Sequence, residues 1–268
     1  MNDKDIILKF SERRRKNYER LYNAKMRRAL NEQFATLAAA IEPDNYMVVL
    51  NPQNTLFLDR YVSAAPVAKV FESLYSTVGS DFARQEYNRL SSKSVKYSAE
   101  DSWRARMRDY AATEAGKRIS SITRSSRKIA LDIIREVLVE STNEGLGAIE
   151  TAANIRRALV AESVPMNQWR ALRIARTEVM TASNVGTYEG AKELEKTEGV
   201  TLEKFWIAAH DDRTRDTHID AEQQSPIALD DKFLVGDYEM ACPGDPAGGA
   251  EEVINCRCTM ATEVKGFN

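Results

Sequence analysis

The sequence has no apolar run long enough to cross a membrane. Its longest apolar stretches, residues 34–41 and 46–50, fall far short of the roughly 20 residues that a spanning helix needs. The first residues include the acidic Asp3 and Asp5, where a signal peptide carries basic residues followed by an apolar stretch. We therefore expect no membrane partner, and we expect the protein to be made and folded in the cytoplasm.

The short motifs of the common enzyme classes are also missing. The sequence has no H-E-x-x-H, no G-x-S-x-G, no P-loop and no dinucleotide-binding fingerprint. Internal repeats and low-complexity tracts are absent too. We therefore expect no enzymatic activity. One alternative stays open, a metal-dependent hydrolase or peptidase that uses His218, Asp220 and Glu222 with the cysteines.

Composition is that of an ordinary globular protein, but the charge is unevenly placed. Of the 268 residues, 43% are hydrophobic and 29% are charged, which excludes collagen, coiled-coil fibres and wholesale disorder. Residues 1–30 carry a net charge of +6, residues 31–200 carry none, and residues 201–268 carry −8, giving −2 in all. The basic start favours either an acidic partner or DNA, or else solvated helix faces.

Helical periodicity dominates the first 200 residues. Apolar residues recur at spacings of three and four within residues 4–42, 66–78 and 124–142, as one face of an amphipathic helix requires. Residues 43–66 lose this pattern around N-P-Q-N at 51–54 and suggest an irregular linker or a small hairpin. Pro165 is expected to end a helix over residues 148–160, before a longer helix over 167–197 begins.

Two basic regions are candidates for non-specific binding of double-stranded DNA. Residues 84–128 hold 12 Lys and Arg against 5 Asp and Glu. They also contain Tyr87, Tyr97, Trp103 and Tyr110, and rings can stack on bases while cations hold phosphates. The same mixture occurs on helices whose rings face the core, so both alternatives stay open. The candidate DNA-binding residues are Arg13, Arg14, Arg15, Lys16, Arg104, Arg106, Arg108, Lys117, Arg118, Arg124, Arg127 and Lys128.

The pattern changes from helix to strand after Gly199. Before it, small and polar residues from Thr177 to Ala191 follow one face of the long helix, and a buried polar face needs hydrogen-bond partners. We expect the C-terminal segment to supply them. The predicted fold is α+β and mostly α, with an extended helical N-terminal region and a small C-terminal α+β module docked on a long helix. The predicted segments are 1–65 (basic arm and linker), 66–199 (helical domain) and 200–268 (acidic module).

Both histidines and all three cysteines lie between residues 210 and 258. Cys256 and Cys258 share one face of a strand, and with Cys242 and His218 or His210 they would make a tetrahedral zinc set. The C-x-C spacing matches no common zinc finger. Three alternatives stay open: a structural zinc, buried reduced thiols, or a disulfide from Cys242 to Cys256 or Cys258.

The order and spacing of several motifs resemble the phage Mu F-like minor head protein family over roughly residues 110–262. The motifs are I-A-R-T-E at 174–178, Asn184, K-F-W at 204–206, D-R-T-R at 212–215 with His218, P-G-D-P at 243–246, and I-N-C-R-C at 254–258. Carried over position by position, the family's motif residues are Arg176, Thr177, Glu178, Asn184, Trp206, Asp212, Arg213, Thr214, Arg215, His218, Asn255, Cys256 and Cys258. His210 and Cys242 lie outside the family's pattern.

The resemblance implies a minor capsid or head morphogenesis protein of a tailed phage or prophage. Such a protein joins the head in few copies, near the portal protein and the capsid shell, and aids head assembly and genome delivery. It would be found in the virion head, and in the host cytoplasm during assembly. Two alternatives are a non-specific DNA-binding protein acting on the packaged or ejected genome, and a metal-dependent hydrolase or peptidase of head maturation.

The motif charges suggest how the module is held. We expect Arg213 or Arg215 to pair with Glu178, and Arg176 to pair with Asp212, because buried ion pairs fix geometry more reliably than they add stability. The Arg176–Glu178 segment of the long helix would then be the platform for the module.

Overall fold

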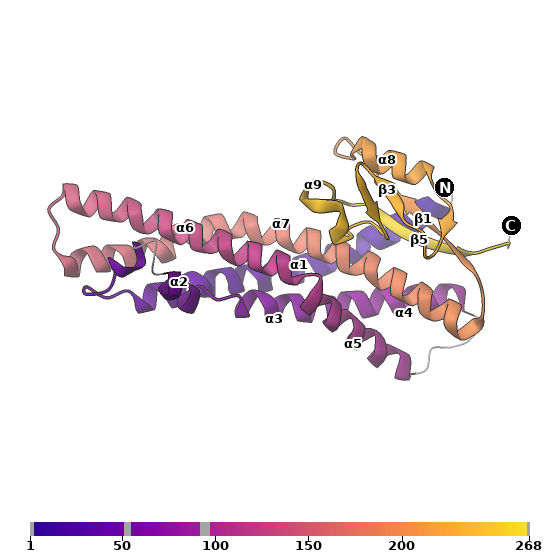
Figure 1. Ribbon diagram of the computed structural model, residues 1–268, viewed down its shortest axis with the longest axis horizontal. Coiled ribbons are helices and arrows are strands. Elements are labelled where there is room, and N and C mark those ends of the chain that lie inside the picture. Colours follow the sequence, from indigo (N-terminus) through magenta and orange to yellow (C-terminus); the bar gives the residue numbers. More distant parts are fainter. Residues whose placement is uncertain (1–2, 51–54, 92–96, 267–268) are drawn as a thin grey trace. The chain divides into compact units, whose positions relative to one another are not determined.

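A computed structural model describes residues 3–50, 55–91 and 97–266. It confirms the predicted fold class, because helices dominate and the described strands form only small antiparallel sheets. Figure 1 labels many of the elements. The helices are α1 (Asp3–Ala40), η1 (Val48–Leu50), α2 (Thr55–Tyr61), α3 (Ala65–Leu74), η2 (Tyr75–Gly79), α4 (Ser80–Leu90), α5 (Tyr97–Thr113), α6 (Gly116–Asn143), α7 (Ala148–Glu198), α8 (Asp216–Gln223), η3 (Pro246–Gly248) and α9 (Gly249–Val253). In this described part, no helix combines the length and the apolar character that crossing a bilayer demands.

Contacts within the chain group it into two compact units with borders unlike the predicted segments. The first unit consists of residues 1–22, 71–115 and 173–268, and the second of residues 23–70 and 116–172. Both long helices, α1 and α7, pass through both units. The first unit holds all the described strands, and it is the one that carries the motif residues.

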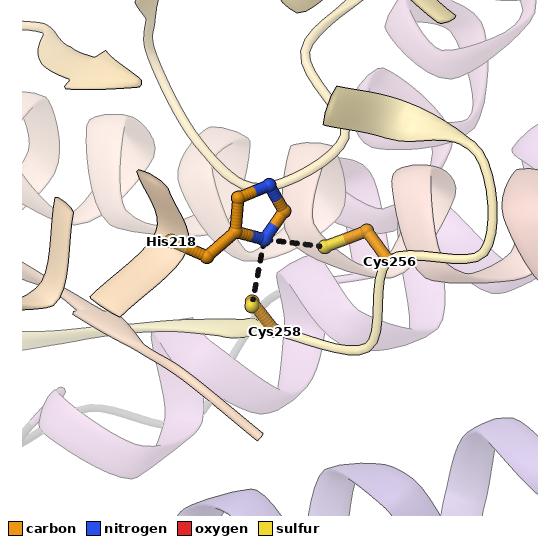
Figure 2. A group of neighbouring side chains, drawn as sticks. All are labelled: His218, Cys256 and Cys258. Carbon is orange, nitrogen blue, oxygen red and sulfur yellow. Dashed lines mark hydrogen bonds between the residues drawn. The ribbon is translucent and has the colours of Figure 1, made fainter. Parts of the chain in front are cut away.

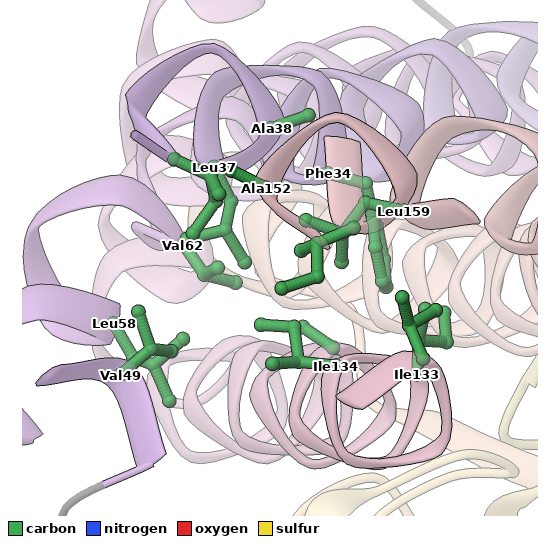
Figure 3. Packing of buried hydrophobic residues seen from close by; sticks show 14 residues of the cluster. Phe34, Leu37, Ala38, Val49, Leu58, Val62, Ile133, Ile134, Ala152 and Leu159 are labelled. Carbon is green, nitrogen blue, oxygen red and sulfur yellow. The ribbon is translucent and has the colours of Figure 1, made fainter. Parts of the chain in front are cut away.

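The second unit is a helical assembly around one apolar core. Leu37 from α1, Ile134 from α6 and Leu159 from α7 are among its buried side chains, and Figure 3 shows them together with residues from η1 and α2. Fully burying an aliphatic side chain of this size is worth about 1.5–3 kcal/mol. The core forms because each helix contributes one apolar stripe, as the spacings of three and four predicted.

One local prediction is wrong in this unit, and of the two alternatives for residues 43–66 the described part shows an irregular, partly helical linker. Pro165 does not end a helix, since α7 runs unbroken from Ala148 to Glu198. Proline removes one backbone hydrogen bond, but buried residues on both sides, such as Leu159 and Ala171, hold the helix against its neighbours. Residues 43–66 contain η1 and the short helix α2 in place of a hairpin, while the predicted turn at 51–54 lies outside the described residues.

A three-stranded antiparallel sheet forms the centre of the C-terminal module, which we define as residues 200–266. Strand β1 (Leu202–Ile207) lies between β2 (Ile227–Ala228) and β5 (Thr259–Val264). A separate hairpin joins β3 (Phe233–Val235) to β4 (Tyr238–Met240). The register pairs Trp206 with Met260. The strand predicted around residues 205–207 is therefore present. The final strand, predicted over residues 252–260 with Cys256 and Cys258 on one face, begins only at Thr259, and both cysteines lie in the irregular segment before it.

Alternation along β1 buries both of its faces. Phe205 and Ile207 pack with Ile7 and Leu8 from the first turns of α1, whereas Trp206 joins the core of the module on the opposite face. Period-two alternation of this kind places successive side chains on opposite faces of a sheet. The beginning of α1 therefore covers one side of the sheet.

Candidate functional site at the junction of α7 and the C-terminal module

Asn184 fastens the module to α7 through its side-chain amide. Its Nδ2 donates to the carbonyls of Pro243 and Cys258, each at 3.1 Å, and its Oδ1 accepts from the Met260 amide at 3.0 Å. The side chain is 2% exposed. Because buried polar groups are costly unless they are paired, this residue fixes two loops and the start of β5 on the helix. The predicted polar face of α7 does bind the C-terminal segment.

Three further contacts bring the C-terminal module against α7 and α1. The hydroxyl of Thr177 accepts the Asn255 amide at 3.1 Å. Gly244 passes so close to α7 that a Cβ there would lie 2.7 Å from the Thr181 hydroxyl oxygen, and its φ of +86° is one that glycine adopts readily. Arg15 of α1 donates to the Cys258 carbonyl at 3.1 Å and to the Thr259 hydroxyl.

The predicted ion pairs across this junction are wrong. Glu178 is buried and accepts a hydrogen bond from the Tyr75 hydroxyl at 2.7 Å. Arg176 is half exposed, with its Nε 3.9 Å from a Glu19 carboxylate oxygen. Residues two apart point to different faces of a helix, so Arg176 and Glu178 have separate partners. Both partners belong to other helices and not to the C-terminal module. Neutral hydrogen bonds from Thr177 and Asn184 hold the module instead.

The D-R-T-R segment forms a turn that leads into α8. Asp212 pairs with its neighbour Arg213 at 3.8 Å, and the Thr214 hydroxyl accepts the Asp211 amide at 3.0 Å. Arg215 donates to the Ile254 carbonyl at 2.8 Å. This last bond brings the turn against the I-N-C-R-C segment, and Arg257 of that segment pairs with Asp211. Sequence reasoning missed the Asp211–Arg257 pair, although both residues adjoin motif residues.

His218, Cys256 and Cys258 form a buried cluster. Nδ1 of His218 lies 3.3 Å from the Cys258 sulfur and 3.6 Å from the Cys256 sulfur, as Figure 2 shows. The three residues are between 1% and 4% exposed, and their ligand atoms all lie within 4.8 Å of one another. Helix α8 supplies the histidine, and the segment before β5 supplies both cysteines. The sequence analysis placed these three residues in one candidate ligand set, and the structure brings them together.

The electrostatics of the cluster distinguish its two thiols. Interactions with Cys256 and His218 hold the pKa of the Cys258 thiol well below its usual range. The interaction with Cys258, together with burial, raises the pKa of Cys256. Trp206 packs edge-on against the His218 ring at 5.3 Å between centroids. One of the two sulfurs is therefore set up to carry a negative charge.

Glu252 completes the surroundings of the cluster and was missed by sequence reasoning. Its carboxylate lies 2.9 Å from Nε2 of His218 and accepts the Thr217 hydroxyl, also at 2.9 Å. Glu252 itself is only 8% exposed. Glu252 lies in the short helix α9, four residues before Cys256. Because it is far from His218 in the sequence, no local pattern predicted that the two side chains would be in contact.

Cys242 lies apart from this cluster, against the prediction. Within the described residues, the candidate metal group contains His218, Cys256 and Cys258 without it. Cys242 is buried near Asp245 and Lys204, and burial raises the pKa of its thiol. All three cysteines are free thiols. His210 also lies elsewhere, exposed, with its Nε2 2.6 Å from Glu222.

Lys204 is a buried cation, and the sequence analysis did not predict its burial. Its side chain is fully buried, and Nζ donates to the Ala241 carbonyl at 2.8 Å. The ammonium also lies over the rings of Tyr188 and Phe233, 5.1 and 5.4 Å from their centroids. Burial lowers the pKa of Lys204 to about 8. A bond to one carbonyl and two rings replaces only part of the water that this charge loses on folding.

A cavity of about 600 Å³ opens beside the cysteines. Cys256 forms part of its wall, and the acidic residues among its lining are Glu12, Glu19 and Glu251. The cationic lining residues outnumber them and are Arg15, Lys16, Arg176, Arg213, Arg215 and Arg257. The cavity, lined by α1, α7 and the C-terminal module, is therefore basic although the module's own net charge is strongly negative.

The candidate DNA-binding residues are divided between the two units. Arg13, Arg14, Arg15, Lys16, Arg104, Arg106 and Arg108 belong to the first unit, and Lys117, Arg118, Arg124, Arg127 and Lys128 belong to the second. Arg15 is 4% exposed and bonded to the C-x-C segment, so its assignment to DNA is wrong.

Several other candidates are engaged in ion pairs. Arg14 bonds Asp81, Arg104 pairs with Glu100, Arg106 pairs with Glu189 and Glu193, and Arg127 pairs with Asp59. Arg13, Lys16, Arg108, Lys117, Arg124 and Lys128 have exposed side chains, and Arg118 is partly buried. The phosphate-binding candidates are therefore fewer than the sequence suggested.

The rings interleaved with these charges face the protein. Trp103 is fully buried and packs on Tyr87 at 5.7 Å between centroids. Tyr110 packs on Tyr75 at 5.3 Å, while the side chain of Tyr97 lies outside the described part. Base stacking is therefore not the role of the three described rings, and the alternative of an amphipathic helix is confirmed for them.

Comparison with known proteins corrects one expectation. The chain is 32% identical over 160 residues to NAD(+)--arginine ADP-ribosyltransferase EFV of Enterococcus faecalis, which is 59% of this chain and 31% of that relative. The chain thus spans about a third of the length of the curated relative it matches. This relative is named as an enzyme, and that finding contradicts the expectation of no enzymatic activity, which rested on the missing motifs.

The same comparisons place most of the motif residues within one family. No solved structure matches the chain. Residues 132–261 match the model of the family described as Phage Mu protein F like protein. This stretch contains Asn184, Asn255 and the His218, Cys256 and Cys258 cluster described above. The match over residues 132–261, just under half of the chain, confirms the resemblance to the phage Mu F-like family that the motifs predicted.

Proposed function

We propose that this chain is a head morphogenesis protein of a tailed phage or prophage, built into the virion head as a minor capsid component. The match of residues 132–261 to the phage Mu F-like family carries the proposal. Its partners would be the portal protein and the capsid shell, and a few copies near the portal would aid head assembly and genome delivery. During assembly it would reside in the host cytoplasm.

The geometry of the junction supports a structural role. Asn184 and Thr177 bond backbone groups of the C-terminal module. Backbone groups offer fixed positions, so such bonds define one orientation of the module on α7. A component that must dock repeatedly in an assembling particle benefits from a surface held in one shape, because less order has to be gained on binding.

Quantitative mass spectrometry of purified particles tests this proposal. DNA-filled particles and empty procapsids would be prepared from a strain that encodes the chain, and its peptides counted against those of the major capsid protein. We expect a few copies per particle in both forms. Absence of the chain from both forms, with the capsid protein abundant, would contradict the proposal.

An ADP-ribosyltransferase activity is a second candidate, favoured by the named relative. The activity belongs to the whole relative, of which this chain matches 31%. Incubating the purified chain with NAD⁺ and an arginine analogue tests it directly. Release of nicotinamide with transfer of ADP-ribose would establish this activity in the chain. Lack of both, under conditions where a known transferase is active, would remove the candidate.

A further inference from the structure

We propose that Nδ1 of His218 and the sulfurs of Cys256 and Cys258 bind one Zn²⁺ ion. Zinc bonds of about 2.0 Å to nitrogen and 2.3 Å to sulfur, at tetrahedral angles, place the two ligand atoms about 3.5 Å apart. The observed separations of Nδ1 from the two sulfurs are 3.3 and 3.6 Å. Both nitrogen–sulfur separations therefore match those around a tetrahedral ion, and all three ligand atoms lie within 4.8 Å of one another (Figure 2).

The contact between His218 and Glu252 supports this assignment independently. A histidine that binds zinc through one ring nitrogen commonly donates its other N–H to a carboxylate. Here Nε2 lies 2.9 Å from the Glu252 carboxylate on the side away from the sulfurs, so Nδ1 is left as the lone-pair nitrogen facing Cys256 and Cys258. The edge-on contact with Trp206 also restrains the ring.

The backbone of the C-x-C segment is fixed before any ion binds. The Cys258 carbonyl accepts hydrogen bonds from Asn184 and Arg15, each at 3.1 Å, and the Cys256 amide donates to the Val253 carbonyl at 3.2 Å. A site whose ligands are held in place loses little conformational entropy on binding. Metal affinity is therefore supported by the same bonds that fasten the module to α7.

The chemistry of the ligands selects the ion. Two thiolates and an imidazole suit zinc, whereas carboxylate and water ligands suit magnesium or calcium. Binding displaces the thiol protons into solvent, and no electron is transferred. Among the described residues, the cluster supplies three ligands, and Cys256 lines the basic cavity. We assign the fourth position to a water molecule that enters from this cavity.

Metal analysis of the full chain tests the site, independently of the proposed function. The chain would be reduced, incubated with Zn²⁺ and separated from unbound metal by gel filtration. Its zinc content would then be measured by inductively coupled plasma mass spectrometry. We expect one zinc per chain, and we expect Cys256→Ser and Cys258→Ser each to lose it. Cys242→Ser is the matched control, because Cys242 is also a buried thiol in this module but lies outside the cluster. It should keep the zinc.

A second variant keeps the test decisive where a cysteine variant fails to fold. Glu252→Gln leaves all three ligands in place and removes the charge that holds Nε2–H, so its zinc affinity should fall about 10–100-fold. Replacing zinc by Co²⁺ in the wild-type chain should give the intense absorption of tetrahedral cobalt thiolate. Zinc below about 0.2 per folded wild-type chain, with Cys256 and Cys258 titrating as thiols or joined as a disulfide, would overturn the proposal.

Discussion

Asn184 shows how a single polar side chain can join two parts of a fold. It uses both ends of its amide, donating to two carbonyls and accepting one amide from the module. An apolar residue of similar size would fill the space but leave these backbone groups unpaired, at about 1–3 kcal/mol for each group. The motif asparagine is therefore explained by packing and hydrogen bonding, with no catalytic role required.

Replacing Asn184 by Ala should destabilise the chain by about 3 kcal/mol. The variant leaves the Pro243 carbonyl and the Met260 amide without their side-chain partner, whereas the Cys258 carbonyl keeps Arg15. Urea denaturation followed by circular dichroism measures the change. The control is Gln168→Ala, which truncates an exposed amide on the same helix and should change the free energy of unfolding by less than about 0.5 kcal/mol. Equal stability of the two variants would contradict this account of Asn184.

Lys204 should make stability depend on pH in the alkaline range. Its folded pKa of about 8 lies below the ordinary lysine value, so between roughly pH 10.4 and 8 the unfolded chain binds a proton that the folded chain does not. The contribution of Lys204 to the free energy of unfolding therefore falls as the pH falls through this window. Below it the loss is constant, at about 3 kcal/mol.

Lys204→Met removes this pH dependence. Relative to the wild type, the variant should be favoured at pH 7 by about 3 kcal/mol more than at pH 10.5, as measured by denaturation at a series of pH values. Lys265→Met changes an exposed lysine of the same module and serves as the control, because an exposed ammonium loses little hydration on folding. A stability difference between Lys204→Met and the wild type that is constant across this range would refute the prediction.

At the scale of elements, two glycines of α7 allow η2 and α4 to pack closely against this helix. Gly186 and Gly190 face the backbone of η2 and α4, where a Cβ would lie 2.1 Å from the Gly79 oxygen and 2.2 Å from the Ala83 oxygen. Side chains cannot move out of the way of a backbone contact of this kind. The two glycines, four residues apart on one helix face, thus let the helices of the first unit pack at short range.

A methyl group at Gly186 should be costly. Gly186→Ala places a Cβ against the Gly79 carbonyl and should lower the free energy of unfolding by about 2–3 kcal/mol, measured by chemical denaturation. Gly116→Ala adds the same methyl group at the first residue of α6, where nothing lies within 4 Å. That variant should be neutral or should gain at most about 1 kcal/mol. A harmless Gly186→Ala would show that the helices can separate without loss.

The sequence predicted the elements better than their partners. Spacings of three and four located α1, α3 and α6, because an amphipathic stripe is a local property. The prediction from Pro165 was wrong, since the packing that keeps α7 helical on both sides of it comes from residues distant in sequence. The same limit explains the errors in the site: the partners of Glu178 and Arg176 lie on other helices, and the position of Glu252 beside His218 depends on the tertiary fold.

At the scale of the whole molecule, the family region covers part of both units. Residues 132–172 belong to the second unit and residues 173–261 to the first, and α7 runs through both. The module reaches α7 through bonds at Asn184 and Thr177, and its sheet reaches α1 through Ile7 and Leu8. Loosening the junction should therefore change how the module sits on α7 and α1 within the first unit.

Incorporation of two variants into particles tests the central claim most directly. A strain encoding the wild-type chain, Asn184→Ala or Gln168→Ala would be induced, and the copies per purified particle counted by mass spectrometry. If the chain is a head component that depends on the docked module, Gln168→Ala should match the wild type and Asn184→Ala should fall at least about tenfold. Incorporation of Asn184→Ala at the wild-type level, or absence of the wild-type chain from particles, would contradict the account.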